Sequence, residues 1–312
     1  MPLALYIVLS VIVLWIVCGG YVFWAACRRK KGISWLDETA VEKTQFRDYI
    51  PMIRESDRWL KEHGAQDVYM ENREGLQLHA LWVPNPSAMG TVILVHGYQS
   101  TPLVDAGPAF EGYFKKGFNL LLPTQRANGK SEGKWITFGI KESGDLIEWV
   151  LFHNRTFGSY PVLLSGLSMG ASTVLYTLDQ ELPENVKAAV ADCGFSSPRS
   201  IISSVFTRVT HMPAWLFMWS CEWFARIFGG FSLQEKDTND VLKKNRLPLL
   251  MVHGKDDHYV PCEMTERAYS GCTGSKRLLL VEGAGHGLSY LVDNATYSEM
   301  IDALLRDAGF IC

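Results

Sequence analysis

Apolar residues divide the 312-residue chain into three zones. Pro2 to Cys27 is an uncharged run of 26 residues. A mixed segment follows, in which Val41 to His63 has helical spacing interrupted at Pro51 and Gly64 provides a natural stop. From residue 67 onward, short apolar runs alternate with amphipathic segments. We therefore expect an anchor with a basic flank over 1–31, a helical linker over 32–66 and one large domain over 67–312.

The alternation in the third zone predicts the fold class. Strand-like apolar runs occupy 67–72, 76–83, 91–95, 118–122, 162–165, 187–191, 248–252 and 277–281. Glu74-Gly75 forms a hairpin turn between the first two runs, and helical patterns cover 139–153, 168–180 and 290–308. This order predicts an α/β fold with a mostly parallel, eight-stranded sheet and helices on both faces.

The pentapeptide Gly166-Leu167-Ser168-Met169-Gly170 carries the strongest chemical signal. It reads G-x-S-x-G, the turn that exposes a nucleophilic serine between a strand and a helix. An apolar run precedes it and a helical pattern follows it, as this turn requires. A serine hydroxyl becomes a useful nucleophile only beside a base and near donors for a developing oxyanion, so the rest of the chain must supply these groups.

Candidates for the acid and the base follow in the required chain order. The acid comes after the strand-like run 248–252 and is Asp257, with Asp256 as the alternative; the spacing to Val260-Pro261 favours Asp257. The base, His286, comes after the run 277–281. Both candidates therefore lie just past the carboxyl ends of strands, where open α/β sheets place their sites.

These motifs resemble those of the α/β-hydrolase superfamily over residues 67 to 312. The likeness extends to its single-domain serine hydrolases with an N-terminal anchor, the BEM46-like and YqkD-like groups related to serine aminopeptidases. The resemblance implies a triad of Ser168, Asp257 and His286. His96-Gly97-Tyr98 resembles the oxyanion loop, so the backbone N–H groups of Tyr98 and Met169 are the expected oxyanion donors.

Other histidines near these motifs have simpler interpretations. His96 and His253 each begin a tight turn and are expected to be structural, and His258 is expected to be a solvated loop residue. Residues 123–133 depart from the family pattern, because Thr124 stands where it has aspartate and Asn128 where it has histidine. These departures concern loop geometry and substrate choice rather than the triad.

The segment 195–247 interrupts the strand–helix alternation and is too long for an ordinary loop. In a hydrolase of this fold it would form a helical lid over the site. It is rich in aromatic residues: Phe206, Trp215, Phe217, Trp219, Trp223, Phe224, Phe228 and Phe231. They are expected either to pack the lid onto the body or to form an apolar surface for acyl chains and the bilayer.

The first 27 residues predict an uncleaved, single-pass membrane helix. A helix of 26 residues is about 39 Å long, enough to cross a hydrocarbon core of about 30 Å. Arg28-Arg29-Lys30-Lys31 follows the run, which places the catalytic domain in the cytoplasm by the positive-inside rule. The opposite orientation is the alternative, since Asn154 and Asn294 begin formal glycosylation sequons.

Composition excludes several other classes. A net charge of −3 gives no basic field, so nucleic acid is not an expected partner. The sequence shows no zinc-binding spacing and no phosphate-binding glycine loop, so no metal or cofactor is expected. We expect a membrane-anchored serine esterase acting on a small-molecule or lipid acyl ester. The alternatives are a serine aminopeptidase or amidase of the same fold and a non-catalytic membrane scaffold.

Overall fold

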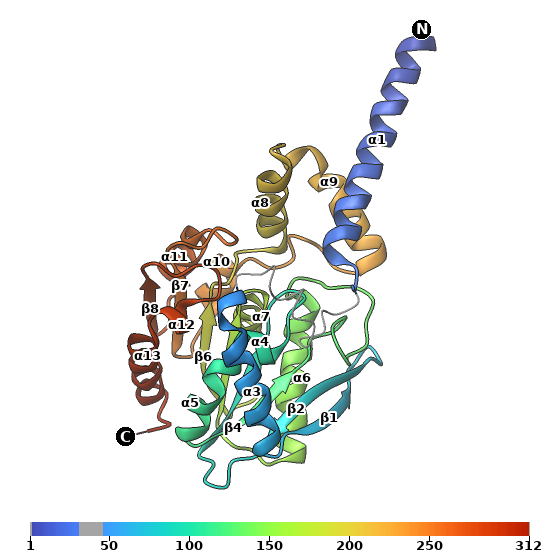
Figure 1. Ribbon diagram of the computed structural model, residues 1–312. Helices are drawn as coiled ribbons and strands as arrows, with labels where there is room; N and C mark the ends of the chain where they lie inside the picture. Colours follow the sequence, from blue (N-terminus) through green and yellow to red (C-terminus); the bar gives the residue numbers. More distant parts are fainter. Residues whose placement is uncertain (1, 31–45, 312) are drawn as a thin grey trace.

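The computed structural model describes residues 2–30 and 46–311, and it has one central sheet (Figure 1). The strands are β1 (Gln66–Glu71), β2 (Gln77–Val83), β3 (Gly90–Val95), β4 (Phe118–Pro123), β5 (Val162–Leu167), β6 (Val186–Asp192), β7 (Leu249–Gly254) and β8 (Lys276–Val281). The longer helices are α1 (Pro2–Cys27), α3 (Ile50–Glu62), α6 (Ile140–Thr156), α7 (Met169–Thr177), α8 (Pro198–Thr210), α9 (Trp215–Phe224), α11 (Cys262–Gly271) and α13 (Asn294–Asp307). Shorter helical segments are η1 (Arg47–Tyr49), α4 (Pro102–Ala106), η2 (Gly107–Ala109), α5 (Phe110–Lys115), η3 (Ala225–Gly229), α10 (Thr238–Val241), η4 (Leu242–Lys244) and α12 (Ser289–Val292).

The sheet confirms the predicted topology. Its eight strands run in the order β1-β2-β4-β3-β5-β6-β7-β8. β2 is antiparallel to both β1 and β4, and all later neighbours are parallel. The fully buried patterns of β3, β4 and β7 follow from helices covering both faces.

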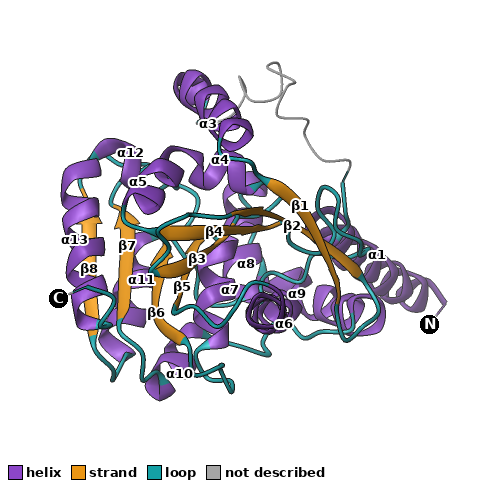
Figure 2. Ribbon diagram, turned by 90° about the horizontal axis from the view of Figure 1, so that it is seen from below, coloured by secondary structure: helices purple, strands orange, loops and turns teal. Residues whose placement is uncertain are grey.

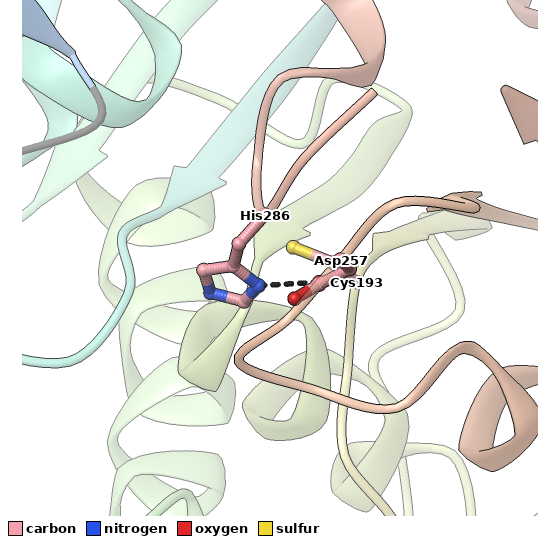
Figure 3. A group of neighbouring side chains, drawn as sticks. All are labelled: Cys193, Asp257 and His286. Atoms are coloured by element: carbon pink, nitrogen blue, oxygen red, sulfur yellow. Dashed lines mark hydrogen bonds and ion pairs between the residues drawn. The ribbon is translucent and has the colours of Figure 1, made fainter. Parts of the chain in front are cut away.

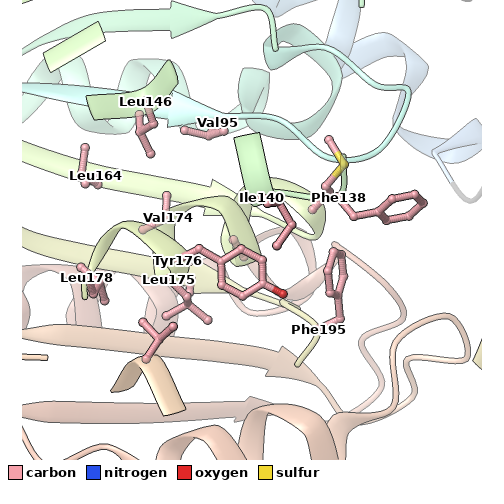
Figure 4. Packing of buried hydrophobic residues seen from close by; sticks show 14 of the residues in the cluster. Val95, Phe138, Ile140, Leu146, Leu164, Val174, Leu175, Tyr176, Leu178 and Phe195 are labelled. Carbon is pink, nitrogen blue, oxygen red and sulfur yellow. The ribbon is translucent and has the colours of Figure 1, made fainter. Parts of the chain in front are cut away.

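Helices cover both faces of the sheet (Figure 2), and an apolar core lies on each face. One contains side chains of α6 and α7, and the other contains side chains of α3, α5 and α13. Figure 4 shows part of the first core, where Tyr176 lies near Ile140 and Phe195. The Tyr176 hydroxyl donates a hydrogen bond of 3.1 Å to the Ser196 carbonyl, so the buried phenol has a partner.

The expected linker differs in detail from its prediction. Residues 32–45 lie outside the described part of the chain. Pro51 does not interrupt a helix but lies in the first turn of α3, where proline is tolerated because its missing N–H has no helical partner. The helix ends at Glu62, and Gly64 follows with a φ of +67°.

The segment expected to form a lid contains α8, α9, η3, α10 and η4. Figure 1 shows α8 and α9 projecting from the body on the same side as α1. α1 packs along α9 at two glycines: a β-carbon on Gly19 would lie 1.9 Å from Ser220 Oγ, and one on Gly20 would lie 2.9 Å from the Phe224 ring. Only a residue without a side chain allows the two helix backbones to approach this closely.

The chain after α1 is tied to the body. Arg28 forms an isolated antiparallel bridge with Trp135, and the Arg29 guanidinium donates to the carbonyls of Gly129 and Ser131 at 2.7 and 2.8 Å. One of the four basic residues after the apolar run therefore has a structural role. By length and composition, Leu3–Cys27 could cross a membrane.

Candidate active site

The turn between β5 and α7 presents Ser168. β5 ends at Leu167, α7 begins at Met169, and Ser168 has φ +56° and ψ −116°. A β-carbon on Gly166 would lie 2.2 Å from the Gly170 carbonyl oxygen, and one on Gly170 would lie 2.0 Å from the Val95 carbonyl oxygen. Both glycines are thus required by close backbone contacts, and the neighbouring structure holds the serine in a conformation that L-residues rarely adopt.

A continuous hydrogen-bond chain joins the three residues that the sequence singled out. The Ser168 Oγ–His286 Nε2 distance is 2.8 Å, and the His286 Nδ1–Asp257 Oδ2 distance is 2.6 Å. The side chain of Asp257 is fully buried and that of His286 is 13% exposed. Asp256, the alternative acid, is exposed, and its carboxylate forms no hydrogen bond with Ser168, Asp257 or His286.

Three hydrogen bonds and one further imidazole contact hold the Asp257 carboxylate. Oδ1 accepts from the backbone N–H groups of Tyr259 and Val260 at 2.7 and 2.9 Å. Oδ2 lies near His253 Nε2 as well as His286 Nδ1. Burial alone would raise the pKa of this carboxyl, but the hydrogen bonds from His253 and His286 outweigh burial and hold the pKa well below its usual range. The carboxyl is therefore ionised whenever the protein is folded near neutral pH.

His253 has a second contact that the sequence did not predict. It was expected to be structural, and its Nδ1 lies 2.7 Å from Thr265 Oγ1. Its Nε2 faces two acceptors, the Val260 carbonyl at 3.0 Å and Asp257 Oδ2 at 3.2 Å. Nε2 must therefore carry the proton, and its N–H faces both the Val260 carbonyl and the Asp257 carboxylate.

The loop after β3 lies directly against the serine. A β-carbon on Gly97 would lie 3.2 Å from Ser168 Cβ, so the loop expected to supply an oxyanion donor packs against Ser168. The Gly97 N–H and the Ser100 hydroxyl each donate to Asp105 at 2.5 Å. This partly buried carboxyl fixes the loop that carries Tyr98, while Met169 lies at the start of α7, directly after Ser168.

The Tyr98 side chain links this loop to α1. Its hydroxyl donates to the Ala26 carbonyl at 2.7 Å and accepts from Gln99 Nε2 at 2.8 Å. Its ring stacks on Phe138 with centroids 5.3 Å apart. No motif could have indicated this contact, because it joins residues 72 positions apart in the chain.

His96 has the structural role that the sequence predicted for it. Nδ1 lies 2.8 Å from the Gly97 carbonyl, and Nε2 accepts from the Gln125 backbone N–H at 2.9 Å. Because burial lowers the pKa of His96 to about 4, the ring is neutral and braces the loop after β3.

The loop that departs from the family pattern is also braced. Arg126 forms a buried bidentate pair with Asp145, with N–O distances of 2.6 and 2.7 Å. Thr124 Oγ1 lies 3.1 Å from His79 Nδ1, and Asn128 donates to the Arg126 carbonyl at 3.3 Å. The substituted residues thus make local contacts, and none of these contacts involves Ser168 or His286.

A cavity of about 740 Å³ adjoins Ser168 and His286. Its walls are mostly apolar. One wall comes from α8 and includes Ile202, Val205 and Phe206, and the facing wall includes Tyr21, Val22 and Ala25 of α1. The N-terminal helix therefore helps to enclose the site.

Cys193 lies beside Asp257 and His286 (Figure 3). Its sulfur, an Asp257 oxygen and a His286 nitrogen lie within 4.8 Å of one another, a grouping that could in principle bind a metal ion. The hydrogen bond drawn in Figure 3 already occupies His286 Nδ1 and Asp257 Oδ2. Burial, together with the charges of Asp192 and Asp257, raises the pKa of the Cys193 thiol well above its ordinary value, so the thiolate that a metal needs is disfavoured.

Known proteins share this sequence and architecture. A family described as "alpha/beta hydrolase fold" matches residues 90–216, and one described as "TAP-like protein" matches residues 223–310. The chain is 29% identical to the uncharacterized protein YqkD of Bacillus subtilis over 69% of this chain and 70% of that protein. It is 24% identical to the uncharacterized protein YfhR of Escherichia coli K12, over 71% and 73% of the two chains.

Solved structures agree on the fold. The Pyrococcus furiosus esterase Pf2001 superposes with a TM-score of 0.64 at 23% identity, covering 79% of this chain and 93% of that one. An esterase from Exiguobacterium antarcticum superposes with a TM-score of 0.59 at 17% identity, covering 77% and 100%. With its sheet order, its strand–serine–helix turn and these two family matches, the chain belongs to the α/β-hydrolase superfamily.

Proposed function

We propose that this protein is a membrane-anchored serine hydrolase that cleaves carboxylic acyl esters through an acyl-enzyme intermediate. The observation that carries the proposal is the unbroken hydrogen-bond chain from Ser168 through His286 to Asp257. This arrangement supplies a nucleophile, a base and an orienting acid within hydrogen-bond distance of one another.

The geometry supports a two-step mechanism. Ser168 Oγ attacks the ester carbonyl carbon while His286 Nε2 takes its proton, and the tetrahedral intermediate collapses with transfer of that proton to the leaving alkoxide. Water then attacks the acyl-enzyme by the same route and releases the acid. Asp257 keeps the proton of neutral His286 on Nδ1 and stabilises the imidazolium that forms in each step.

The oxyanion would be received by the backbone N–H groups of Tyr98 and Met169. These residues belong to the two segments that flank Ser168, the loop after β3 and the start of α7. Loss of one such donor typically costs about 3 kcal/mol of barrier. The side chains at both positions are free to serve other purposes, as the Tyr98 hydroxyl does at Ala26.

The cavity favours a lipophilic ester over a peptide. A volume of about 740 Å³ with apolar walls suits an acyl chain. Asp105 is the acidic residue among the described residues that line it, and its oxygens already accept from Gly97 and Ser100. The Glu222 carboxylate of the lid accepts hydrogen bonds from the Arg226 and Ser232 side chains. Asp105 therefore already has two hydrogen-bond donors, and Glu222 does not line the cavity, which disfavours an aminopeptidase because such an enzyme needs a carboxylate for the substrate amine. The solved esterases of this fold are consistent with the ester assignment.

The packing of α1 supports an anchor that remains attached. Its glycines fit closely against α9, and the Ala26 carbonyl in its last turn accepts a hydrogen bond from the Tyr98 hydroxyl. Its side chains also line the cavity. A cleaved signal sequence would have no reason to make these contacts. The basic residues after Cys27 favour a cytoplasmic catalytic domain.

Labelling with a fluorophosphonate probe tests the proposal. Wild-type protein should be labelled, and Ser168→Ala should not be.

Asp257→Asn should lower ester hydrolysis by about 10⁴-fold, because the wrong imidazole tautomer is favoured. Asp256→Asn is the matched control and should retain activity. If wild type and Ser168→Ala were equally unlabelled, the non-catalytic scaffold would be favoured. A preference for aminoacyl anilides over p-nitrophenyl esters would favour the peptidase.

A further inference from the structure

The lid carries an exposed apolar face on α9 and η3. Trp215, Trp219, Trp223 and Ile227 recur at intervals of four, and their exposed fractions are 68, 63, 60 and 70%. Residues four apart lie on the same side of a helix. These residues, called here the lid tryptophan face, do not line the catalytic cavity. A contiguous apolar face of this kind marks a surface that contacts a protein or a membrane.

The contacts between α1 and α9 show that the two helices run in the same direction. The Trp15 indole donates to the Leu216 carbonyl, and the Ser220 hydroxyl donates to the Trp15 carbonyl at 3.0 Å. Gly20 then faces Phe224. Moving toward the body along α1 thus corresponds to moving from Trp215 toward Phe224 along α9.

This parallel pairing fixes the depth of α9 in a bilayer that α1 crosses. Trp15 lies 12 positions before Cys27, which is about 18 Å along a helix. One leaflet contributes about 15 Å of hydrocarbon. α9 therefore lies alongside the part of α1 that occupies the leaflet nearest the catalytic domain, with Trp215 the deepest of its tryptophans.

The charges on α9 and η3 are compatible with this depth, and the Arg199 guanidinium of α8 lies 5.9 Å from the centre of the Trp219 ring. Residues 212–221 contain no charged side chain. Glu222 is 4% exposed and accepts from Arg226, Ser232 and the Leu233 backbone. Arg226 lies beyond α9, toward the headgroup level. The polar Ser220 is also satisfied, because its hydroxyl donates to the Trp15 and Phe217 carbonyls.

The cavity lies beside the same half of α1 that is assigned to the near leaflet. Tyr21, Val22 and Ala25 form one wall, and the side chains of α8 form the facing wall. A molecule dissolved in the near leaflet could therefore reach Ser168 between α1 and α8 without crossing the aqueous phase.

We propose that the lid tryptophan face is a second membrane contact, and that the substrate is an acyl ester resident in the near leaflet that enters the site between α1 and α8. This inference rests on the proposed function and adds the source of the substrate. A lipid bilayer is the occupant because the face continues alongside α1, which is itself long and apolar enough to span a membrane.

The test compares two esters with the same leaving group in full-length protein reconstituted in phosphatidylcholine vesicles. 4-Methylumbelliferyl butyrate serves as the soluble substrate, and 4-methylumbelliferyl oleate as the ester that resides in the bilayer. In the triple variant W215Q/W219Q/W223Q we expect oleate turnover to fall about tenfold or more, because apolar contact with the leaflet is lost. Butyrate turnover should stay within about twofold of wild type. The variant Y69Q/Y160Q changes exposed aromatic residues outside the lid and should leave both rates unchanged.

A second measurement does not depend on how the triple variant folds. Single p-benzoylphenylalanine substitutions at 215, 219 and 223 should photo-crosslink to phosphatidylcholine, whereas one at exposed position 69 should not. Equal crosslinking at 69 and on the lid, or unchanged oleate turnover in a triple variant that still cleaves butyrate, would overturn the inference while leaving the serine hydrolase proposal intact. Failure of wild-type protein to react with the fluorophosphonate probe would instead refute that proposal.

Discussion

The His253 Nε2 atom lies 3.2 Å from Asp257 Oδ2, the same oxygen that contacts His286 Nδ1 at 2.6 Å. Two imidazoles therefore contact one carboxylate oxygen: that of His286, which is also hydrogen-bonded to Ser168, and that of His253. We interpret His253 as a positioning residue that keeps the acid ionised and correctly oriented.

Replacing this second imidazole should weaken acyl transfer without abolishing it. In His253→Gln we expect kcat to fall about 10- to 100-fold, because a buried hydrogen bond to a charged group contributes about 1.5–3 kcal/mol. KM should change little, since His253 does not line the cavity. His258→Gln, on the exposed part of the same loop, is the control. Equal rates for the two variants would remove His253 from the mechanism.

The hydrogen bond from Tyr98 to Ala26 should couple the anchor to the oxyanion loop. Tyr98→Phe keeps the ring and removes the hydroxyl, leaving the Ala26 carbonyl without this donor. We expect a loss of about 1–3 kcal/mol in the docking of the last turn of α1. Limited proteolysis after Arg28 or Lys30 should become faster, and kcat should fall. Tyr69→Phe, at an exposed strand position, is expected to match wild type in both assays.

The glycine contact between α1 and α9 allows a comparison of two helical glycines. Gly19→Ala places a methyl group against Ser220 and the Cys221 backbone, so we expect it to separate the helices and lower oleate turnover. Gly144→Ala in α6 meets nothing within 4 Å and should instead stabilise the protein by about 0.5–1 kcal/mol. Thermal unfolding in detergent measures the stability of both variants, and hydrolysis of oleate ester in vesicles measures turnover. A stabilised Gly19→Ala would contradict the close packing.

The buried carboxyl of Asp192 should make the stability of the protein depend on pH. Burial raises the pKa of this carboxyl to about 6, against about 3.9 in an unfolded chain. Between these values the folded state binds the proton more tightly, so stability falls as pH rises through this window and the full cost is present above pH 6. Asp192→Asn should therefore raise the free energy of unfolding by about 1–3 kcal/mol at pH 8 and by little at pH 4. Exposed Asp256→Asn is the control; an equal gain at both pH values would show that ionisation is not the cause.

The sequence alone was sufficient to predict the strands of the sheet, because the strands that are buried in the structure are also apolar runs in the sequence. All eight expected strands are present, with ends that differ by at most two residues from the expected ranges, and the turn at Ser168 lies between β5 and α7 as predicted. Asp257 was favoured over Asp256 by spacing, and the structure places Asp257 beside His286. These features depend on the pattern and spacing of residues that are close together in the sequence, so they can be predicted from one sequence.

The remaining features depend on contacts between distant segments. The Asp105 carboxyl under Gly97, the approach of His253 to Asp257 and the Tyr98–Ala26 bond have no signature in residue spacing. The same is true of α1, which was expected only to hold the enzyme at a membrane. Its contribution to the cavity wall follows from its packing on α9, and hydropathy does not encode that packing.

Because α1 supplies part of the binding chamber, the usual strategy of expressing only the water-soluble portion would alter the enzyme itself. A fragment that begins after Cys27 would lack the surface formed by Tyr21, Val22 and Ala25 and the acceptor for the Tyr98 hydroxyl. Substrate screens carried out on such a fragment would report the preferences of a more open catalyst. Assigning a physiological substrate to this hydrolase therefore calls for full-length material in lipid from the outset.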